Sequence, residues 1–363
     1  MNIIQRMLCA IIAVIFILSA CCRKNPAGFT MPDDPRTYTW TADTLAGGLY
    51  KVWGSTHQDV YATGDDGCDP DRFMYHFDGK TWKPCTGIRS INTYPGIYFL
   101  TNILGFGKDN IWVTGGFDTV IQPGRKTCEL VTQYNGSEWD VVYISKYDTV
   151  NHLGITSIWG SSPENMWFGG ACGTMLHWDG TEMSRDSLPS PLYRHMAPDR
   201  WWAEIHAMAG QEGHGLFASF FADDGYTCFL LERTEDTWVI RDSLHNYIDL
   251  WMSPSGTLYA ANFDGVHKWN GTSLEPCITD ICCWSVFGTD DNNIFAAGSV
   301  YNYDDDVWYN GDVVWYNGVR WQHIDGCQYD NIHYLDGWTD GNEIFLVASM
   351  RNSCQNLMVR GKQ

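Results

Sequence analysis

The chain has 363 residues, of which 15% are aromatic, and contains 18 Trp, 19 Tyr and 36 Gly. Its formal net charge of −20 at pH 7 disfavours nucleic acid and anionic lipid surfaces as partners, because like charges repel. Abundant aromatic residues and glycine, with few long runs of Leu, Ala, Glu and Lys, favour many short strands joined by tight turns and exclude a mainly helical body.

The first 21 residues differ from the rest of the chain. Arg6 supplies a positive charge, Met7–Ala20 is almost entirely apolar, and Cys21 follows. This pattern predicts a secretory leader over residues 1–21, because the apolar run is shorter than the roughly 20 residues that a transmembrane helix needs. The closing sequence Leu-Ser-Ala-Cys resembles the signature of bacterial lipoproteins. The resemblance implies that Cys21 is lipidated and becomes the mature N-terminus.

Residues 22–36 are polar, rich in proline and without a hydrophobic period, which predicts a flexible tether. Two or more acyl chains on Cys21 would anchor such a chain stably without spanning the membrane. Cys22, Arg23 and Lys24 include no acid, so retention at an inner membrane is not indicated. We therefore expect an exported protein anchored to the outer membrane, with its periplasmic or surface side left open.

The rest of the chain, residues 37–363, repeats one pattern of four short strands. Each repeat opens with a strand that ends in a turn marker. The markers are Trp53-Gly54-Ser55, Leu104-Gly105, Trp159-Gly160-Ser161, Ala209-Gly210, Met252-Ser253, Phe287-Gly288 and Asp336-Gly337. A second apolar strand follows each marker, and most third and fourth strands flank an Asp-Gly or Asn-Gly hairpin signal.

Seven markers but only six complete hairpins are present, because the chain after the last marker has room for three strands. The strand expected at residues 37–44 would supply the missing fourth strand and close a ring. Periods of about 35 to 55 residues with four strands each are typical of propellers. The sequence thus predicts an all-β, seven-bladed β-propeller with four-stranded antiparallel blades over residues 37–363. Six blades are the alternative, because the fourth and fifth repeats lack the Trp-Gly-Ser turn.

These repeats resemble those of bacterial propeller repeat proteins whose blades read Trp-Gly-Ser, then Asp-Val-Trp-Ala-Gly, then His-Trp-Asp-Gly-x-x-Trp. The resemblance covers the whole body and implies the same fold. The hairpin turns also resemble the Asp-box of sialidases, but the Ser-x-Asp spacing that precedes the box is absent here.

In such a blade the links from second to third strand, and from one blade to the next, share one face, and here they vary widely in length. Variable loops on a rigid scaffold are usual places for binding sites. We expect this variable loop face to carry Asp65, Asp66, Asp69, Asp71, Asp118, Asp223, Asp224, Asp304, Asp305, Asp306 and Asp312. Asp65, Asp66, Asp69 and Asp71 are candidate calcium ligands, but their spacing departs from the calcium-loop pattern, so solvated loops are favoured and no cofactor is expected.

The same face would carry the insertion between the third and fourth repeats. Its candidate binding residues are Tyr193, Arg194, His195 and Arg200, because arginine with exposed aromatic residues suits a protein hot spot or a sugar-stacking platform. Asp304, Asp305 and Asp306 complete the candidate binding face. Trp201 and Trp202 fit packing in the next strand better.

Ten cysteines after Cys22 map towards this face. An even number in an exported chain indicates disulfides. We expect Cys68 to pair with Cys85, and next Cys327 with Cys354. Zinc is disfavoured, because no pair of C-x-x-C motifs is present.

Neither a nucleophile elbow nor a phosphate-binding glycine loop is present. His76 and His177 recur at one repeat position, which favours a structural role. The sequence therefore predicts a lipid-anchored envelope propeller that acts as a binding or scaffold module. An enzymatic function is less favoured, and no catalytic residue is assigned. The alternative is a carbohydrate-binding or carbohydrate-active envelope protein. The expected partners are the membrane, bound through the lipid on Cys21, and an envelope protein or glycan. The sequence makes no prediction of the oligomeric state.

Overall fold

The computed structural model describes residues 34–65, 73–85, 97–120, 125–145, 154–196, 203–246, 249–302, 307–351 and 353–363. The predicted leader and most of the predicted tether lie outside these residues. Among the residues described, no helix is long and apolar enough to cross a membrane. The helical elements described are the short 3-10 helices η1 (Pro35–Thr37), η3 (Ser190–His195) and η4 (Asp325–Cys327). The prediction of an all-β body is confirmed.

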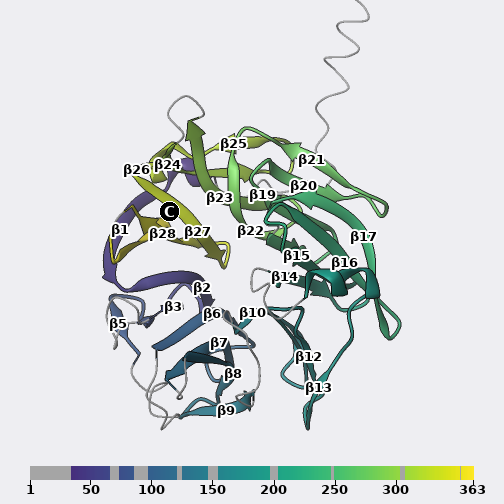
Figure 1. Cartoon of the computed structure of the whole chain (residues 1–363). Helices are drawn as coiled ribbons and strands as arrows, with labels where there is room; N and C mark the ends of the chain where they lie inside the picture. Colours follow the sequence, from purple (N-terminus) through teal and green to yellow (C-terminus); the bar gives the residue numbers. More distant parts are fainter. Residues whose placement is uncertain are drawn as a thin grey trace, which may run out of the picture. The chain divides into compact units, whose positions relative to one another are not determined.

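Strands follow one another in sets of four along the chain (Figure 1). The first two sets are β2 (Gly48–Thr56), β3 (Asp59–Asp65), β4 (Met74–Phe77) and β5 (Trp82–Pro84), then β6 (Ile97–Gly105), β7 (Ile111–Val120), β8 (Arg125–Tyr134) and β9 (Trp139–Ile144). The next two are β10 (Ile155–Ser162), β11 (Asn165–Gly170), β12 (Met175–Trp178) and β13 (Met183–Arg185), then β14 (Glu204–Gln211), β15 (Gly215–Phe221), β16 (Thr227–Thr234) and β17 (Thr237–His245).

The last sets are β18 (Asp249–Met252), β19 (Leu258–Asn262), β20 (Gly265–Trp269) and β21 (Leu274–Ile278), then β22 (Cys282–Asp290), β23 (Asn293–Asn302), β24 (Val307–Tyr316) and β25 (Trp321–His323) with the short β26 (Tyr329–Asp330), and finally β27 (Ile332–Thr339), β28 (Glu343–Met350) and β29 (Gln355–Lys362). Among the named strands of the described residues, every pairing is antiparallel. The pairs join strands that follow one another in the chain, except for β26 with β24, β1 (Thr39–Ala46) with β29, and one residue pair between β3 and β6. That single pair, Asp65 with Phe99, joins the first two sets into one eight-stranded sheet.

The last sheet also holds the first strand of the chain. Strand β1 (Thr39–Ala46) pairs with β29 from Thr39 opposite Lys362 to Ala46 opposite Gln355, which gives the order β1-β29-β28-β27. The strand expected near residues 37–44 therefore lies beside the final strand, and strands from the two ends of residues 34–363 share one sheet.

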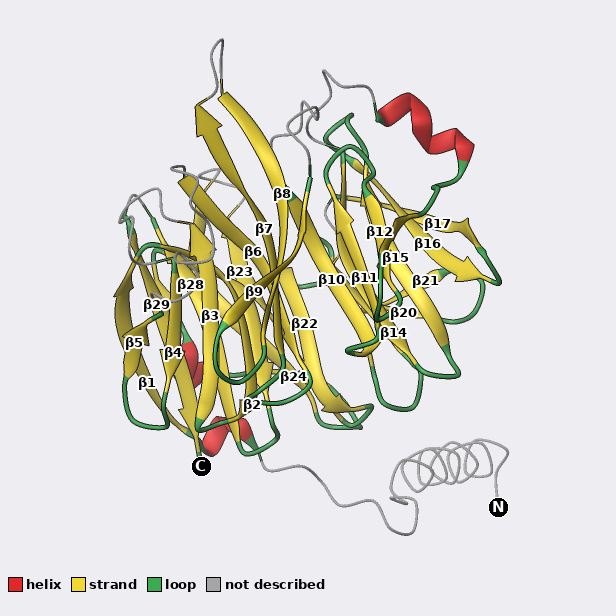
Figure 2. Ribbon diagram, turned by 90° about the horizontal axis from the view of Figure 1, so that it is seen from below, coloured by secondary structure: helices red, strands yellow, loops and turns green. Residues whose placement is uncertain are grey.

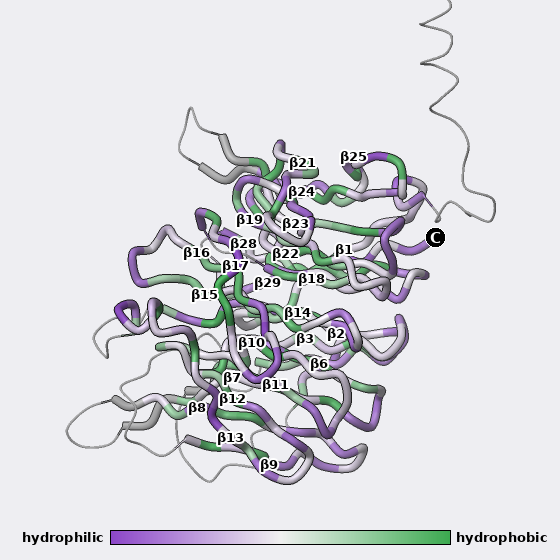
Figure 3. The backbone as a smooth tube through the Cα atoms, turned by 90° about the vertical axis from the view of Figure 1, so that its right-hand side faces the viewer, coloured by the Kyte–Doolittle hydropathy of each residue, from purple (hydrophilic) through white to green (hydrophobic). Residues whose placement is uncertain are grey.

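The first strand of each set packs against the first strand of the next. Strands β2, β6, β10, β14, β18, β22 and β27 contact one another in this order, and β27 also contacts β2. We call these seven the inner strands. Seven buried clusters lie between the sets, and each combines residues from two consecutive sets or from the first and last. Figure 3 shows the hydrophobic residues concentrated in strands and the hydrophilic ones in turns.

Indole rings that lie over glycines explain the repeated Trp-Gly turn. A Cβ atom at Gly105 would lie 2.3 Å from the ring of Trp53, and one at Gly54 would lie 2.8 Å from the ring of Trp338. Trp159 lies in the same way on Gly210, to whose carbonyl it donates a 3.0 Å hydrogen bond from Nε1. Each aromatic ring thus packs on the glycine of the following set, because only a residue without a side chain leaves room for the ring.

Between the fourth and fifth sets, which lack the Trp-Gly-Ser turn, the small residue stands at the aromatic position and the large residue at the glycine position. Ala209 takes the aromatic position, opposite Phe217, and Met252 takes the glycine position, opposite Leu258. Both lie in one buried cluster, so a small residue and a large one again fill the space together. In the last set the strand register aligns Trp338, opposite Phe345, with Trp53, opposite Tyr61. The seventh marker is therefore Trp338-Thr339, two residues beyond the predicted one.

The predicted hairpin turns are confirmed. In the five that have an Asp-Gly or Asn-Gly centre, the Asp or Asn side chain accepts backbone hydrogen bonds from the two residues that follow the glycine, as Asp179 does from Thr181 and Glu182 at 2.8 and 2.9 Å. Gly180 has a φ of +93°, a conformation that favours glycine.

Substituting Gly105 by alanine should destabilise the protein by about 1–3 kcal/mol, because the new methyl group would overlap the Trp53 ring. Urea unfolding followed by circular dichroism measures the change. Gly48→Ala is the matched control, since its Cβ would meet only the carboxylate end of Asp65, which can move. Equal losses in the two variants would contradict the packing argument.

Candidate functional site

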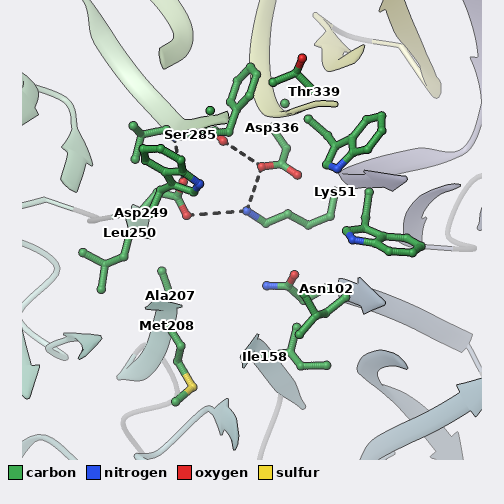
Figure 4. Close-up of a pocket in the computed structure, with 18 residues that line it drawn as sticks. Lys51, Asn102, Ile158, Ala207, Met208, Asp249, Leu250, Ser285, Asp336 and Thr339 are labelled. Atoms are coloured by element: carbon green, nitrogen blue, oxygen red, sulfur yellow. Dashed lines mark hydrogen bonds and ion pairs between the residues drawn. The ribbon is translucent and has the colours of Figure 1, made fainter. Parts of the chain in front are cut away.

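The inner strands line a cavity of about 330 Å³ (Figure 4). Every inner strand contributes to its lining, from Lys51 and Trp53 on β2 to Asp336 and Trp338 on β27. The lining combines charged, amide and hydroxyl groups with aromatic and aliphatic ones. A concave site in which a few placed polar groups stand beside apolar side chains is a usual form of a small-molecule site.

Most of the polar lining residues occupy one position of the repeat, which is alanine in the fourth set. Lys51, Asn102, Ala207, Asp249, Ser285 and Asp336 each lie two residues before the aromatic position of their strand. In five of these strands a register shift directly precedes this residue, as between Leu49 and Lys51. A bulge of this kind turns a side chain away from the sheet packing, here towards the cavity.

Lys51 lies between two carboxylates. Its Nζ atom is 3.3 Å from Asp336 Oδ1 and 3.9 Å from Asp249 Oδ1. Ser285 Oγ donates a 2.9 Å hydrogen bond to the same Asp336 Oδ1. The three charged side chains are 22%, 11% and 13% exposed for Lys51, Asp336 and Asp249, so the cluster is largely shielded from solvent.

Each carboxylate also holds the next inner strand. Asp336 Oδ2 accepts a 2.9 Å hydrogen bond from the backbone N–H of Val52, and Asp249 Oδ2 accepts one of 3.0 Å from Val286. Asn102 does the equivalent through its Nδ2 atom, which donates to the Thr156 carbonyl at 3.3 Å. The residue two positions before the aromatic position therefore joins neighbouring inner strands and also lines the cavity.

Burial and charge set the protonation of this cluster. Burial disfavours the ammonium of Lys51, but Asp336 and Asp249 outweigh it and raise the Lys51 pKa above its ordinary value. Burial raises the pKa of Asp336, against the opposing effect of Lys51. Lys51 consequently remains a cation at neutral pH, which favours binding and disfavours nucleophilic catalysis, since a nucleophilic lysine must lose its proton.

The sequence prediction missed this cluster. Its signal was present, because a polar or charged residue stands two positions before the aromatic residue in Lys-Val-Trp, Asp-Leu-Trp and Asp-Gly-Trp. Because the seventh marker was placed two residues too early, the sequence prediction did not show that Asp336 and Lys51 occupy the same position of the repeat.

Among the predicted loop residues, Tyr193, Arg194 and His195 lie in η3. Figure 2 shows η3 at the end of the strands opposite to the C-terminus. Tyr193 is 54% exposed and Arg194 is exposed, as a binding surface requires. His195 is buried instead, its Nδ1 paired with Asp223 and its Nε2 accepting a 2.9 Å hydrogen bond from Arg194 Nε. His195 therefore supports the turn rather than presenting a contact. Arg200 and the Asp304–Asp306 run lie outside the described residues.

Of the four calcium candidates, Asp65 is the one in the part of the chain that the structure describes. Asp65 lies at the end of β3 and its carboxylate accepts a hydrogen bond from the hydroxyl of Tyr50. Asp66, Asp69 and Asp71 are outside the described residues. Across the described ranges, no group of three or more His, Cys, Asp or Glu side chains could hold a metal ion.

Both predicted disulfide pairs are wrong. Cys85 is free, which excludes its pairing with Cys68, and Cys327 is a free, buried thiol, which excludes its pairing with Cys354. Cys354 forms a disulfide, and its partner is neither Cys85 nor Cys327, since both of these thiols are free. Burial raises the Cys85 pKa to about 12, so this thiol is inert at neutral pH.

The two repeated histidines make matching contacts on their strands. His76 Nε2 lies 2.7 Å from Asp59 Oδ1, and the ring stacks on Tyr61 with centroids 4.3 Å apart. His177 lies 2.8 Å from Asn165 Oδ1 and stacks on Trp167 at 4.2 Å. Repetition of the whole arrangement agrees with a structural role.

No protein family and no curated protein matches the sequence. Solved structures do match, among them YCF48 bound to a D1 peptide, with a TM-score of 0.60 and 12% identity over 92% of this chain and 100% of that chain. YCF48 from Cyanidioschyzon merolae matches with a TM-score of 0.58 and 13% identity over 89% of this chain and 99% of that one. The β-propeller domain of Cps50 (Swd1) from Myceliophteria thermophila matches with a TM-score of 0.56 and 11% identity over 90% and 100%.

These similarities show a β-propeller fold. At such low identity they show the fold alone. The predicted propeller body is confirmed at this level, and each four-stranded set can be called a blade.

Replacing Lys51 by methionine should destabilise the protein by roughly 3 kcal/mol, the low end of the range for removing one partner of a buried ion pair. Without the cation the folded-state pKa of Asp336 rises further. A carboxyl group whose pKa is raised in the folded state stabilises the fold only while it is protonated, and this stability is lost as pH rises through the folded-state pKa. The loss of unfolding free energy in Lys51→Met should therefore be larger at about pH 8 than at about pH 5. Urea unfolding at both pH values measures it.

The double variant Lys51→Met with Asp336→Asn is the control, because the amide oxygen can still accept the Val52 N–H. It should recover much of the loss. A Lys51→Met deficit that does not change with pH would contradict the assigned charges.

Proposed function

We propose that this protein is a lipid-anchored β-propeller of the cell envelope that binds a polypeptide partner through its variable loop face. The observation that carries the proposal is the exposed Tyr193–Arg194 pair on a braced turn. Leu192, next to the pair, is 1% exposed and packs in the cluster between the third and fourth blades. His195, on the other side, is held by Asp223. The backbone that carries the two exposed side chains is thus held on both sides, which lowers the entropy lost on binding.

The chemistry of the pair suits a protein partner. Tyrosine and arginine are enriched in binding hot spots, where the ring supplies apolar area and the guanidinium supplies directed hydrogen bonds. Among the similar structures, YCF48 is seen with a D1 peptide bound, so a propeller of this shape can receive a polypeptide. A partner with an apolar and an acidic side chain would complement the ring and the cation.

The proposal includes a seven-bladed ring closed by β1. Its support is the chain of contacts between inner strands, the cluster shared by the first and last blades, and the pairing of β1 with β29. Polar contacts other than those of Asp336 with Lys51 and Val52 also join the first and last blades. His57 Nδ1 lies 2.7 Å from Asp340 Oδ2, and Asn356 exchanges hydrogen bonds of 3.1 and 2.9 Å with the backbone of Leu49. A ring of this kind is a rigid base for loops.

The location follows from the N-terminal pattern. We propose an outer-membrane address, with Cys21 as the lipidated residue and residues 22–36 as the tether. The apolar run, the Leu-Ser-Ala-Cys sequence and the absence of an acid after Cys21 support it.

Replacing Cys21 by alanine should abolish metabolic labelling with a radioactive fatty acid and shift the protein from the membrane to the soluble fraction. Cys22→Ala is the matched control and should label as the unmodified protein does. Unchanged labelling of Cys21→Ala would contradict the anchor.

Replacing Tyr193 and Arg194 together by alanine should weaken capture of an envelope protein about a hundredfold or more, because two hot-spot residues are lost. Cross-linking in cells, followed by mass spectrometry of the captured partner and titration of the purified pair, measures the effect. Val319→Ala is the control, because Val319 is 63% exposed in a β24–β25 hairpin turn, away from η3. Partner capture unchanged in the double variant, or glycan binding in its place, would overturn the polypeptide assignment.

A further inference from the structure

The central cavity has hydrogen-bonding capacity that the described protein groups do not use. Lys51 Nζ has three N–H groups, and one hydrogen bond is found for it among the described residues, the 3.3 Å contact with Asp336. Asp249 Oδ2 accepts the Val286 N–H, whereas Asp249 Oδ1 lies 3.9 Å from Lys51 Nζ, beyond hydrogen-bonding distance. A donor and an acceptor therefore face the same space side by side (Figure 4).

A hydroxyl group complements this arrangement. It can accept from Lys51 and donate to Asp249 at the same time, whereas an ammonium group could only donate and a carboxylate could only accept. Bonds to charged partners are the stronger kind, so each would contribute to affinity as well as to orientation.

The charge of the cavity selects against ions. Two carboxylates and one ammonium leave the cluster negative or, with Asp336 protonated, neutral, so an anionic ligand gains little. A cationic ligand would compete with Lys51, which already lies between the carboxylates. A neutral ligand with several hydroxyl groups avoids both difficulties.

Aromatic rings line the same cavity. Trp53, Trp251 and Trp338 all contribute, and all three are partly exposed. Trp338 and Trp53 are fixed by the glycines beneath them, Gly54 and Gly105, so their orientation does not depend on a ligand. Fixed indole faces beside hydroxyl-binding groups can cover the C–H faces of a sugar or polyol.

The cavity is separate from the loop face. Its lining runs from Lys51 to Thr339 and Gly288, towards the ends of the inner strands that lead into the short turns. The exposed pair on η3 lies beyond the other end of the strands, opposite to the C-terminus (Figure 2). Occupation of one site therefore does not require occupation of the other.

We propose that the central cavity binds a small neutral polyhydroxylated molecule, a monosaccharide or a polyol. One hydroxyl group bridges Lys51 and Asp249, and the tryptophan faces pack on its carbon skeleton. The volume of about 330 Å³ lies at the lower end of the range of small-molecule sites, which suits a ligand of one ring.

Isothermal titration calorimetry of the mature body tests the proposal with glucose, galactose, N-acetylglucosamine, myo-inositol and sorbitol as probes. We expect saturable binding of at least one probe with a dissociation constant in the millimolar range or tighter. Binding of the cyclic probes alone would identify a sugar-like ring as the ligand, and binding of sorbitol as well would identify a polyol. Absence of saturable binding for all five probes overturns the proposal.

Variants locate the binding. Asp249→Asn keeps an oxygen for the Val286 N–H but loses the charge, and it should weaken the binding probe about tenfold or more. Lys51→Met should do the same, and Lys83→Met is its matched control, because Lys83 forms an exposed pair with Asp78. Thermal unfolding of each variant shows that it is folded. Equal affinity in Asp249→Asn and Lys83→Met overturns the assignment. Tyr193→Ala with Arg194→Ala should bind the probe normally, which separates this site from the proposed partner surface.

Discussion

The packing of an aromatic ring on a glycine of the next blade is the contact on which the rest of this structure depends. Where Trp338 lies on Gly54 and Trp251 on Gly288, the inner strands approach closely enough for side chains to bond the neighbouring backbone. Asp336 then reaches the Val52 N–H, and Asp249 reaches that of Val286. A larger residue at the glycine position would separate the strands and break those bonds. Ala209 and Met252 keep the same spacing with the sizes exchanged.

The same closeness creates the candidate site. A carboxylate that bonds the next strand through one oxygen must direct the other towards the centre, where the side chains of all the inner strands meet. Burying two such carboxylates is costly, and Lys51 offsets the cost by lying between them. The cluster is therefore required by the packing and also chemically competent to bind a ligand. Its protonated lysine and bonded aspartates are suited to recognition and poorly suited to nucleophilic catalysis.

Much of the fold could be predicted, because it depends on local patterns. The Asp179-Gly180 turn has its own hydrogen bonds, and the Trp159-Gly160 marker recurs along the chain. The site could not be read in the same way, since Lys51 and Asp336 are 285 residues apart and meet only when the last blade lies beside the first. The predicted disulfide pairs failed for a related reason: Cys327 is a free, buried thiol that donates to the Ile324 carbonyl, which the sequence does not show. His195 looked like a surface residue because sequence does not show its bond to Asp223.

We therefore propose two separate recognition surfaces, the exposed Tyr193–Arg194 pair for a polypeptide and the central cavity for a neutral polyhydroxylated molecule. A crystal structure of the mature body soaked with the sugar or polyol that binds best tests this account most directly. The account predicts ligand density in the cavity, with one hydroxyl oxygen within hydrogen-bonding distance of both Lys51 Nζ and Asp249 Oδ1. Density for the ligand at the loops around Tyr193, with the cavity occupied by water alone, would contradict it.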